Sequence, residues 1–206
     1  MNAHIRTHAE IDESQKWDFW QFATDYGMQY YTAGRFAVFA GHIPTAGNQL
    51  HHALEFLLKA CLAYKDSWDQ IKDYGTWASY RHDVEKLWAE FKNRNADPAL
   101  AAHDDLIAQL QKFENIRYPE KMRELNRMFT FSVIEIAPGQ ETRSADGRRY
   151  ETYDIQLPKV DRLVQRVYQA THCPVSLQQY HGHPDAKAFL WRDNATPPFP
   201  RPDWIP

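Results

Sequence analysis

The sequence predicts a mainly α-helical protein, an antiparallel up-and-down bundle of four to five helices with a small β-hairpin inserted at about 129–156. Apolar residues recur every three or four positions along most of the chain, which is the period of an amphipathic helix. Helix start and stop signals separate these segments, and one stretch instead alternates like paired strands. The 206 residues can enclose one core. We therefore expect one domain over 1–206, with an irregular tail at 174–206.

The first two segments have the strongest helical patterns. Apolar and aromatic residues repeat with helical spacing from Glu13 to Ala40, and Gly27 and Gly34 are expected to bend or divide this helix. The sequence Ile43-Pro44-Thr45 interrupts the pattern, and Thr45 is the expected N-cap of the second helix. The apolar face of that helix consists of Leu50, Leu54, Leu57, Leu58, Cys61 and Leu62.

Two further helices are predicted in the middle of the chain. The third covers Ser79–Phe91, where apolar residues again have helical spacing. The fourth begins at Asp97-Pro98, which fits an N-cap followed by proline in the first turn. We expect it to end near Arg117, because Pro119 disfavours the helical conformation in the residue before it.

The pattern changes between Phe129 and Gln156. This stretch is rich in strand-forming residues, and Pro138-Gly139 and Asp146-Gly147 are turn signals, which together predict the hairpin. Pro158 then opens a closing helix at 158–172. Its apolar face consists of Val160, Leu163, Val164, Val167 and Tyr168. The Pro- and Trp-rich end of the tail is expected to lie along the surface or against a partner.

Composition excludes several classes of protein. The formal net charge of −3 gives no overall field that attracts a polyanion, so contact with nucleic acid would need a local basic patch. We find neither a signal peptide nor an apolar run near the roughly 20 residues of a membrane span, so we expect a cytoplasmic protein without a membrane partner. Cys61 and Cys173 are expected to be free thiols in a reducing compartment.

Three short sequences, His52–Ala60, Tyr80–Leu87 and Asn115–Pro119, occur in the order of three motifs of one family. They resemble the second-helix signature, the His-Asp-Leu start of the next helix and the Arg-Tyr-Pro segment of the HEPN superfamily. The resemblance covers roughly residues 20 to 125. It implies an all-α bundle that frequently dimerises and that acts with nucleotides, RNA, or nucleotidyltransferase and toxin–antitoxin type partners.

The candidate ligand-binding residues within these motifs are Glu55, Lys59, His82, Asp83, Arg117 and Tyr118. Glu55 and Lys59 are one helical turn apart and can form a surface pair. If Glu55 instead enters the bundle, it needs a partner, and Arg117 is a suitable one. Arg117 equally suits a phosphate, and the ring of Tyr118 suits a nucleobase. Asp83 fits a helix cap better than chemistry.

The resemblance also raises the question of catalysis, because many HEPN proteins cut RNA with an Arg and a His that are separated by four to six residues. No such His follows Arg117. Arg35 with His42 and Arg166 with His172 have a comparable spacing, but about two such pairs are expected by chance. The favoured interpretation is a noncatalytic module that binds a nucleotide, RNA or a protein partner. The alternative is a metal-independent endoribonuclease that uses Arg166 and His172, so enzymatic activity stays open.

Neither a metal nor a cofactor is expected from sequence motifs. His172, Cys173, His181 and His183 lack the paired spacing that prepares a zinc site. The chain also lacks a Gly-rich phosphate loop, a nucleophile elbow and a His-Glu-x-x-His motif. Seven Trp, eleven Tyr and eleven Phe are more large rings than one small core readily holds, so a homodimer is expected to bury part of them.

Overall fold

The structure, a computed structural model, describes residues 8–66, 82–114, 127–132, 151–174 and 188–198. Its elements are α1 (His8–Phe39), α2 (Ile43–Lys65), α5 (Val84–Asn95), the 3₁₀ helix η1 (Pro98–His103), α6 (Asp104–Lys112), β1 (Arg127–Ser132), β2 (Glu151–Gln156) and α8 (Leu157–Ala170). The predicted mainly helical bundle is confirmed. Among the described helices, not one is both long enough and apolar enough to cross a membrane.

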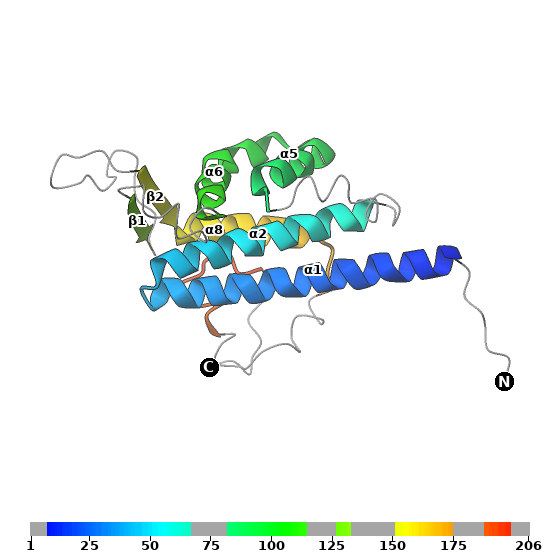
Figure 1. Ribbon diagram of the computed structural model, residues 1–206, viewed down its shortest axis with the longest axis horizontal. Coiled ribbons are helices and arrows are strands. Elements are labelled where there is room, and N and C mark those ends of the chain that lie inside the picture. The colour runs from blue at the N-terminus through cyan, green and yellow to red at the C-terminus, as the bar shows by residue number, and fades with distance from the viewer. Residues whose placement is uncertain (1–7, 67–81, 115–126, 133–150, 175–187, 199–206) are drawn as a thin grey trace.

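Helix α2 lies at the centre of the bundle. It runs antiparallel to α1 and also contacts α5, α6 and α8 (Figure 1). Its leucines at the predicted apolar positions, among them Leu50, Leu54 and Leu57, are fully buried. Burial of such a side chain contributes roughly 1.5–3 kcal/mol, so α2 supplies much of the hydrophobic stabilisation. The predicted apolar face of this helix is confirmed.

Helix α1 runs without interruption through both of its central glycines, so it is neither divided nor ended by them. A Cβ atom at Gly27 would lie 2.7 Å from Cγ of Leu57, and one at Gly34 would lie 2.7 Å from Cδ2 of Leu50. Real Cβ atoms do not approach other atoms so closely. The two glycines therefore allow α1 and α2 to pack at short range.

The start of α2 differs from the prediction that Thr45 is its N-cap. The helix begins at Ile43, its N-cap is His42, and Pro44 lies in the first turn. Proline is tolerated there because the first N–H groups of a helix have no intrahelical partner and its fixed φ is already helical. The proline thus belongs to the helix instead of preceding it. Gly41, with a φ of +73°, makes the turn from α1.

The predicted helices in the middle of the chain are only partly correct. The third helix, expected over Ser79–Phe91, is α5, which begins at Val84 because Asp83 is its N-cap, and which ends at Asn95. The carboxylate of Asp83 caps α5 by accepting a hydrogen bond from the backbone N–H of Lys86 at 3.0 Å. Asp97 accepts from the backbone N–H of Ala99 at 2.9 Å, but the turn that follows is the 3₁₀ helix η1, and α6 begins only at Asp104. This helix ends at Lys112, with Phe113 as its C-cap, and so it ends before the predicted position near Arg117.

The two strands lie where strands were predicted, but the prediction of a hairpin is wrong. β1 and β2 pair in parallel, from Arg127 opposite Glu151 to Ser132 opposite Gln156. Alternation of side chains between two faces is the same for both strand directions, so it does not encode how strands pair. Parallel strands require a connection of a dozen or more residues, for which 133–150 are long enough. The expected turn dipeptides lie outside the described residues.

A buried ion pair joins distant parts of the chain. Arg35 of α1 and Asp161 of α8 are both buried, and the guanidinium donates to the carboxylate. The hydroxyl of Tyr31 donates to the other carboxylate oxygen at 2.7 Å. Arg35 also donates to the backbone carbonyls of Phe189 and Arg192. The 188–198 part of the tail therefore packs on α1 of its own chain.

The first prediction concerns this buried pair. The substitution Asp161→Ala leaves the guanidinium of Arg35 buried without its counter-ion, and it should lower the free energy of unfolding by about 3–5 kcal/mol. Asp193→Asn is the control, because Asn tolerates the left-handed backbone of this residue (φ +48°) and removes only the exposed pair with Arg192 at 4.0 Å, which is worth about 0–1 kcal/mol. Urea unfolding followed by far-UV circular dichroism measures both. Equal losses in the two variants would contradict a central role for the buried pair.

Candidate functional site

One face of α2 carries a buried carboxylate surrounded by donors. Glu55 is only 1% exposed. Its Oε1 accepts a hydrogen bond from Nζ of Lys59 at 2.6 Å, and its Oε2 lies 3.0 Å from Nδ1 of His52. His82, in the segment that leads into α5, places its own Nδ1 3.0 Å from the same Oε2. These four residues, Glu55, His52, Lys59 and His82, are named the Glu55 cluster.

The donors decide the charge state of Glu55. Burial alone raises the pKa of a carboxyl group, but the hydrogen bonds from His52, Lys59 and His82 and the charge of Lys59 outweigh it and lower the pKa of Glu55 to about 2. The carboxylate is therefore ionised at neutral pH and only accepts hydrogen bonds. It follows that His52 and His82 each present an N–H at Nδ1.

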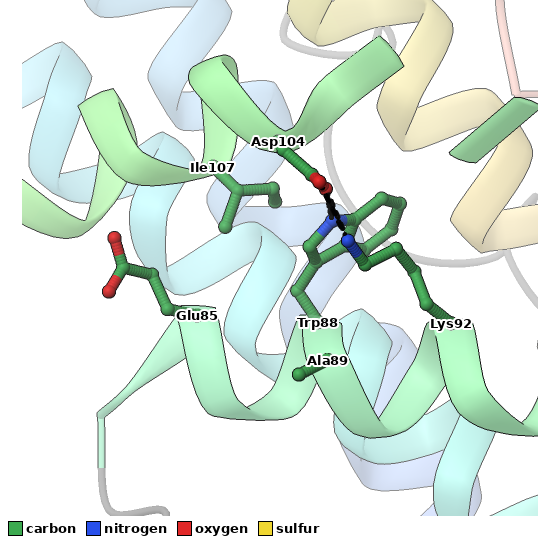
Figure 2. A pocket seen from close by; sticks show the side chains of 6 residues that line it. All are labelled: Glu85, Trp88, Ala89, Lys92, Asp104 and Ile107. Carbon is green, nitrogen blue, oxygen red and sulfur yellow. Dashed lines mark hydrogen bonds and ion pairs between the residues drawn. The ribbon is translucent and has the colours of Figure 1, made fainter. Parts of the chain in front are cut away.

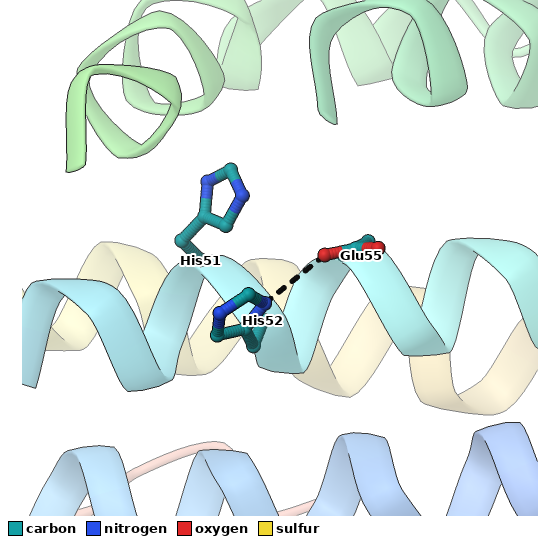
Figure 3. Close-up of side chains that lie close together, drawn as sticks. All are labelled: His51, His52 and Glu55. Atoms are coloured by element: carbon teal, nitrogen blue, oxygen red, sulfur yellow. Dashed lines mark hydrogen bonds and ion pairs between the residues drawn. The ribbon is translucent and has the colours of Figure 1, made fainter. Parts of the chain in front are cut away.

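His51 lies next to the cluster and faces α6. Its side chain is buried, its Nδ1 lies 3.1 Å from the carbonyl oxygen of Leu110, and its Nε2 lies 3.4 Å from Oε2 of Glu114. Figure 3 shows the ring of His51 rising from α2, while His52 and Glu55 meet beside it. Burial, with the neighbouring His52, lowers the pKa of His51 to about 4. The imidazole is therefore neutral and donates its Nδ1–H to Leu110.

An aromatic patch borders the Glu55 cluster. It consists of Phe22, Tyr26 and Tyr30 of α1 and Phe56 of α2. Phe22 and Tyr26 are 45% and 41% exposed, and their ring centroids are 4.2 Å apart. The ring of Tyr30 stacks on Phe56 at 5.6 Å and lies 5.2 Å from the ring of His52. The aromatic patch thus meets the Glu55 cluster where Tyr30 contacts His52.

Three of the six candidate ligand-binding residues, Glu55, Lys59 and His82, are brought together in this cluster. Asp83 instead caps α5, as its position at the helix start predicted. Arg117 and Tyr118 lie outside the described residues, so a contact between Glu55 and Arg117 stays a prediction. His51 and His52 were missed, although they stand four and three positions before Glu55, which is the spacing that places side chains on one helical face.

The candidate catalytic pair of Arg166 and His172 is engaged with two different partners. Arg166 forms an ion pair with Asp97, beside η1. His172 has a φ of +57°, and its ring stacks on Tyr64 of α2 at 4.5 Å. These contacts give no support to joint action on one phosphate.

The other Arg–His pair and the histidine-rich tail give equally little support to catalysis or zinc binding. Arg35 belongs to the buried network described above, and His42 is exposed at the start of α2. Of the possible zinc ligands near the tail, Cys173 is a buried free thiol, and His181 and His183 lie outside the described residues. Cys61 is likewise a buried free thiol, as predicted.

A pocket of about 200 Å³ lies between α5 and α6 (Figure 2). Nε1 of Trp88 and Nζ of Lys92 both donate to Asp104, each at 2.6 Å, so polar groups of this pocket satisfy one another. Ligand sites for small molecules usually enclose about 300–1,000 Å³. The Glu55 cluster and its aromatic patch are therefore the stronger candidate site.

Comparison with protein-family models, with curated proteins and with solved structures finds no match. The similarity to HEPN domains accordingly rests on the three motifs in the sequence. The function has to be inferred from the geometry and chemistry of the cluster.

The second prediction concerns acid sensitivity. The pKa of His51 is about 4 in the folded chain and 6.5 as a free side chain, so the unfolded state binds a proton more readily. This group stabilises the fold above pH 6.5, and its contribution is lost as the pH falls toward 4. The groups that face it are His52, Glu55 and Glu114. We expect protonation of His51 alone to lower the free energy of unfolding by about 2 kcal/mol between pH 7 and pH 4.5.

The variant His51→Asn isolates that contribution, because its amide can still donate to Leu110 but does not titrate. Urea unfolding at pH 7 and at pH 4.5 measures the free energy of unfolding at each pH. The decrease between the two pH values should be smaller in this variant than in the wild type. An identical loss in both proteins would show that His51 does not govern the acid response.

Proposed function

We propose that the chain is a noncatalytic, HEPN-like binding module for a nucleotide or single-stranded RNA. The observation that supports this most is the aromatic patch that continues directly into the Glu55 cluster. A nucleotide combines a flat base with a charged phosphate, and it needs a ring surface beside a polar surface. The two surfaces meet where Tyr30 contacts His52.

The exposed rings provide the stacking part of such a site. Stacking of a base on an aromatic side chain contributes about 1–3 kcal/mol and tolerates any base, because every base has a π face. Phe22 and Tyr26 expose nearly half of their surface, and they are fixed by Phe56 at 6.2 Å and 5.8 Å between ring centroids. Rings held in this way lose little conformational entropy when a base binds.

The polar part is provided by Lys59 and His82. Lys59 lies 5.8 Å from the ring of Phe56, so its positive charge stands at the edge of the patch. His82 is half-exposed, and its Nδ1 is held by Glu55, which orients the opposite side of the ring away from the carboxylate. Glu55 thus acts as a positioning residue for the groups that would contact a phosphate or a base edge.

Dimerisation is part of the proposal. Trp17, Phe22 and Tyr26, all on α1, are 38–45% exposed. Large rings on the surface of one helix are stabilised when a second copy covers them. A two-fold pair would bring two aromatic patches toward each other, and a base could then be held between them.

The third prediction tests stacking. Tyr26→Ala should weaken binding of a fluorescently labelled oligouridine by roughly 5- to 150-fold, the equivalent of about 1–3 kcal/mol. Phe36→Ala is the control, because Phe36 is 51% exposed on the same helix but packs against Phe189, away from the patch. Fluorescence anisotropy at fixed salt measures both affinities.

Equal affinities of the wild type and the Tyr26 variant, or no binding by the wild type, would contradict the proposal. RNA recovered after the titration, carried out in EDTA, should be intact. Cleavage that disappears in His172→Ala would instead establish the endoribonuclease.

The fourth prediction concerns the oligomeric state. Light scattering at micromolar concentration should give twice the single-chain mass of 24.2 kDa. Replacement of Phe22 by Ser should shift the mass toward one chain, because it removes an exposed ring from the proposed contact. A wild-type mass near 24.2 kDa would reject the dimer while leaving nucleotide binding to be judged by the anisotropy experiment.

A further inference from the structure

The Glu55 cluster and the adjacent His51 together contain more imidazoles than hydrogen bonding to one carboxylate requires. One ligand atom from each of His51, His52 and Glu55 lies within 4.8 Å of the others. His82 adds a third imidazole, with its Nδ1 3.0 Å from Oε2 of Glu55. Three imidazole nitrogens and one carboxylate oxygen form a donor set typical of protein zinc sites.

The spacing of these atoms is close to that of a coordination sphere. Ligands bound at about 2.0–2.1 Å in a tetrahedron lie about 3.3 Å apart. Nδ1 of His52 and Nδ1 of His82 each lie 3.0 Å from Oε2 of Glu55. Four separations remain: those among His51, His52 and Glu55 are at most 4.8 Å, and the rings of His52 and His82, with centroids 5.8 Å apart, have to rotate to bring their nitrogens into range.

The surroundings of His51 match those of a metal ligand. Metal-binding histidines generally donate their second ring N–H to a carbonyl or carboxylate, which fixes the ring and makes the ligating nitrogen more basic. The Nδ1 of His51 has that bond to Leu110 at 3.1 Å, and Figure 3 shows a ring nitrogen on the side that faces Glu55. The neutral form of an imidazole is the one that binds metal.

Lys59 does not stand in the way of a cation. Its ammonium lies 2.6 Å from Oε1, whereas Nδ1 of His52 lies 3.0 Å from Oε2. Nδ1 of His82 lies 3.0 Å from Oε2 and 3.1 Å from Oε1, so it reaches both oxygens. The carboxylate can therefore bind a cation through Oε2 and keep Lys59 on Oε1. Glu114, whose carboxylate lies 3.4 Å from Nε2 of His51, adds a second negative charge nearby.

We propose that His51, His52, His82 and Glu55 form a binding site for a divalent transition-metal ion of the zinc class. The site shares Glu55 and His82 with the proposed nucleotide site, but metal binding does not require a nucleotide. For coordination, the Nδ1 protons of His52 and His82 move to Nε2 through solvent, so that Nδ1 presents its lone pair. Mg²⁺ and Ca²⁺ require oxygen ligands and are excluded by this donor set.

Calorimetric titration of the full chain, stripped with EDTA and dialysed, tests the site with ZnCl₂ and with MgCl₂. We expect one Zn²⁺ per chain and no Mg²⁺ at the same concentrations. His52→Ala and Glu55→Gln should each weaken Zn²⁺ binding at least tenfold. His42→Ala is the control, because His42 is an exposed histidine on the same helix that makes no capping bond through its side chain.

His82→Ala provides a variant that does not open the core, because this side chain is 49% exposed. It should also weaken binding, and it should reduce the visible absorption of the protein when Co²⁺ replaces Zn²⁺. Unchanged Zn²⁺ affinity in the His52 and His82 variants would overturn the proposal by placing the ion elsewhere. No binding by the wild type would overturn it directly. Neither result bears on the anisotropy experiment with RNA.

Discussion

The buried contact between Arg35 and Asp161 is the interaction that joins the separate parts of this bundle. It connects α1 to α8, which are more than a hundred residues apart, and it reaches the tail through two backbone carbonyls. Tyr31 satisfies the remaining carboxylate oxygen. An ion pair away from water is costly unless every partner is in place, so this network specifies one arrangement of α1, α8 and residues 188–198.

Most of the fold could be predicted because the signals that form a helix lie in residues close together in the sequence. The apolar face of α2 and the caps at Asp83 and Asp97 are visible in the sequence, since they depend on residues within one or two turns. The parallel pairing of β1 with β2 could not be predicted, because strand direction depends on a long connection. Prediction of Thr45 as a cap failed because proline fits both before a helix and inside its first turn.

The site was predictable only in part. Glu55, Lys59 and His82 were singled out by a family motif, and the burial of Glu55 follows from the leucines around it. The described donors to Glu55 are two histidines and a lysine, and the expected partner, Arg117, lies outside the described residues. The contact with His82 joins positions 27 residues apart, and no local pattern reveals it. The buried role of Arg35 was likewise missed, because its partner belongs to a distant helix.

The close packing of α1 on α2 also sets the position of one helix along the other. Gly27 faces Leu57 and Gly34 faces Leu50. The two contacts are seven residues apart on each helix, and their order is reversed because the helices are antiparallel. A slide by one turn would place bulky side chains where only glycine fits. The two contacts together therefore fix the position of α1 along α2. This fixed position keeps Tyr30 beside His52 and Phe56. The packing of the two helices therefore holds the aromatic patch next to the Glu55 cluster.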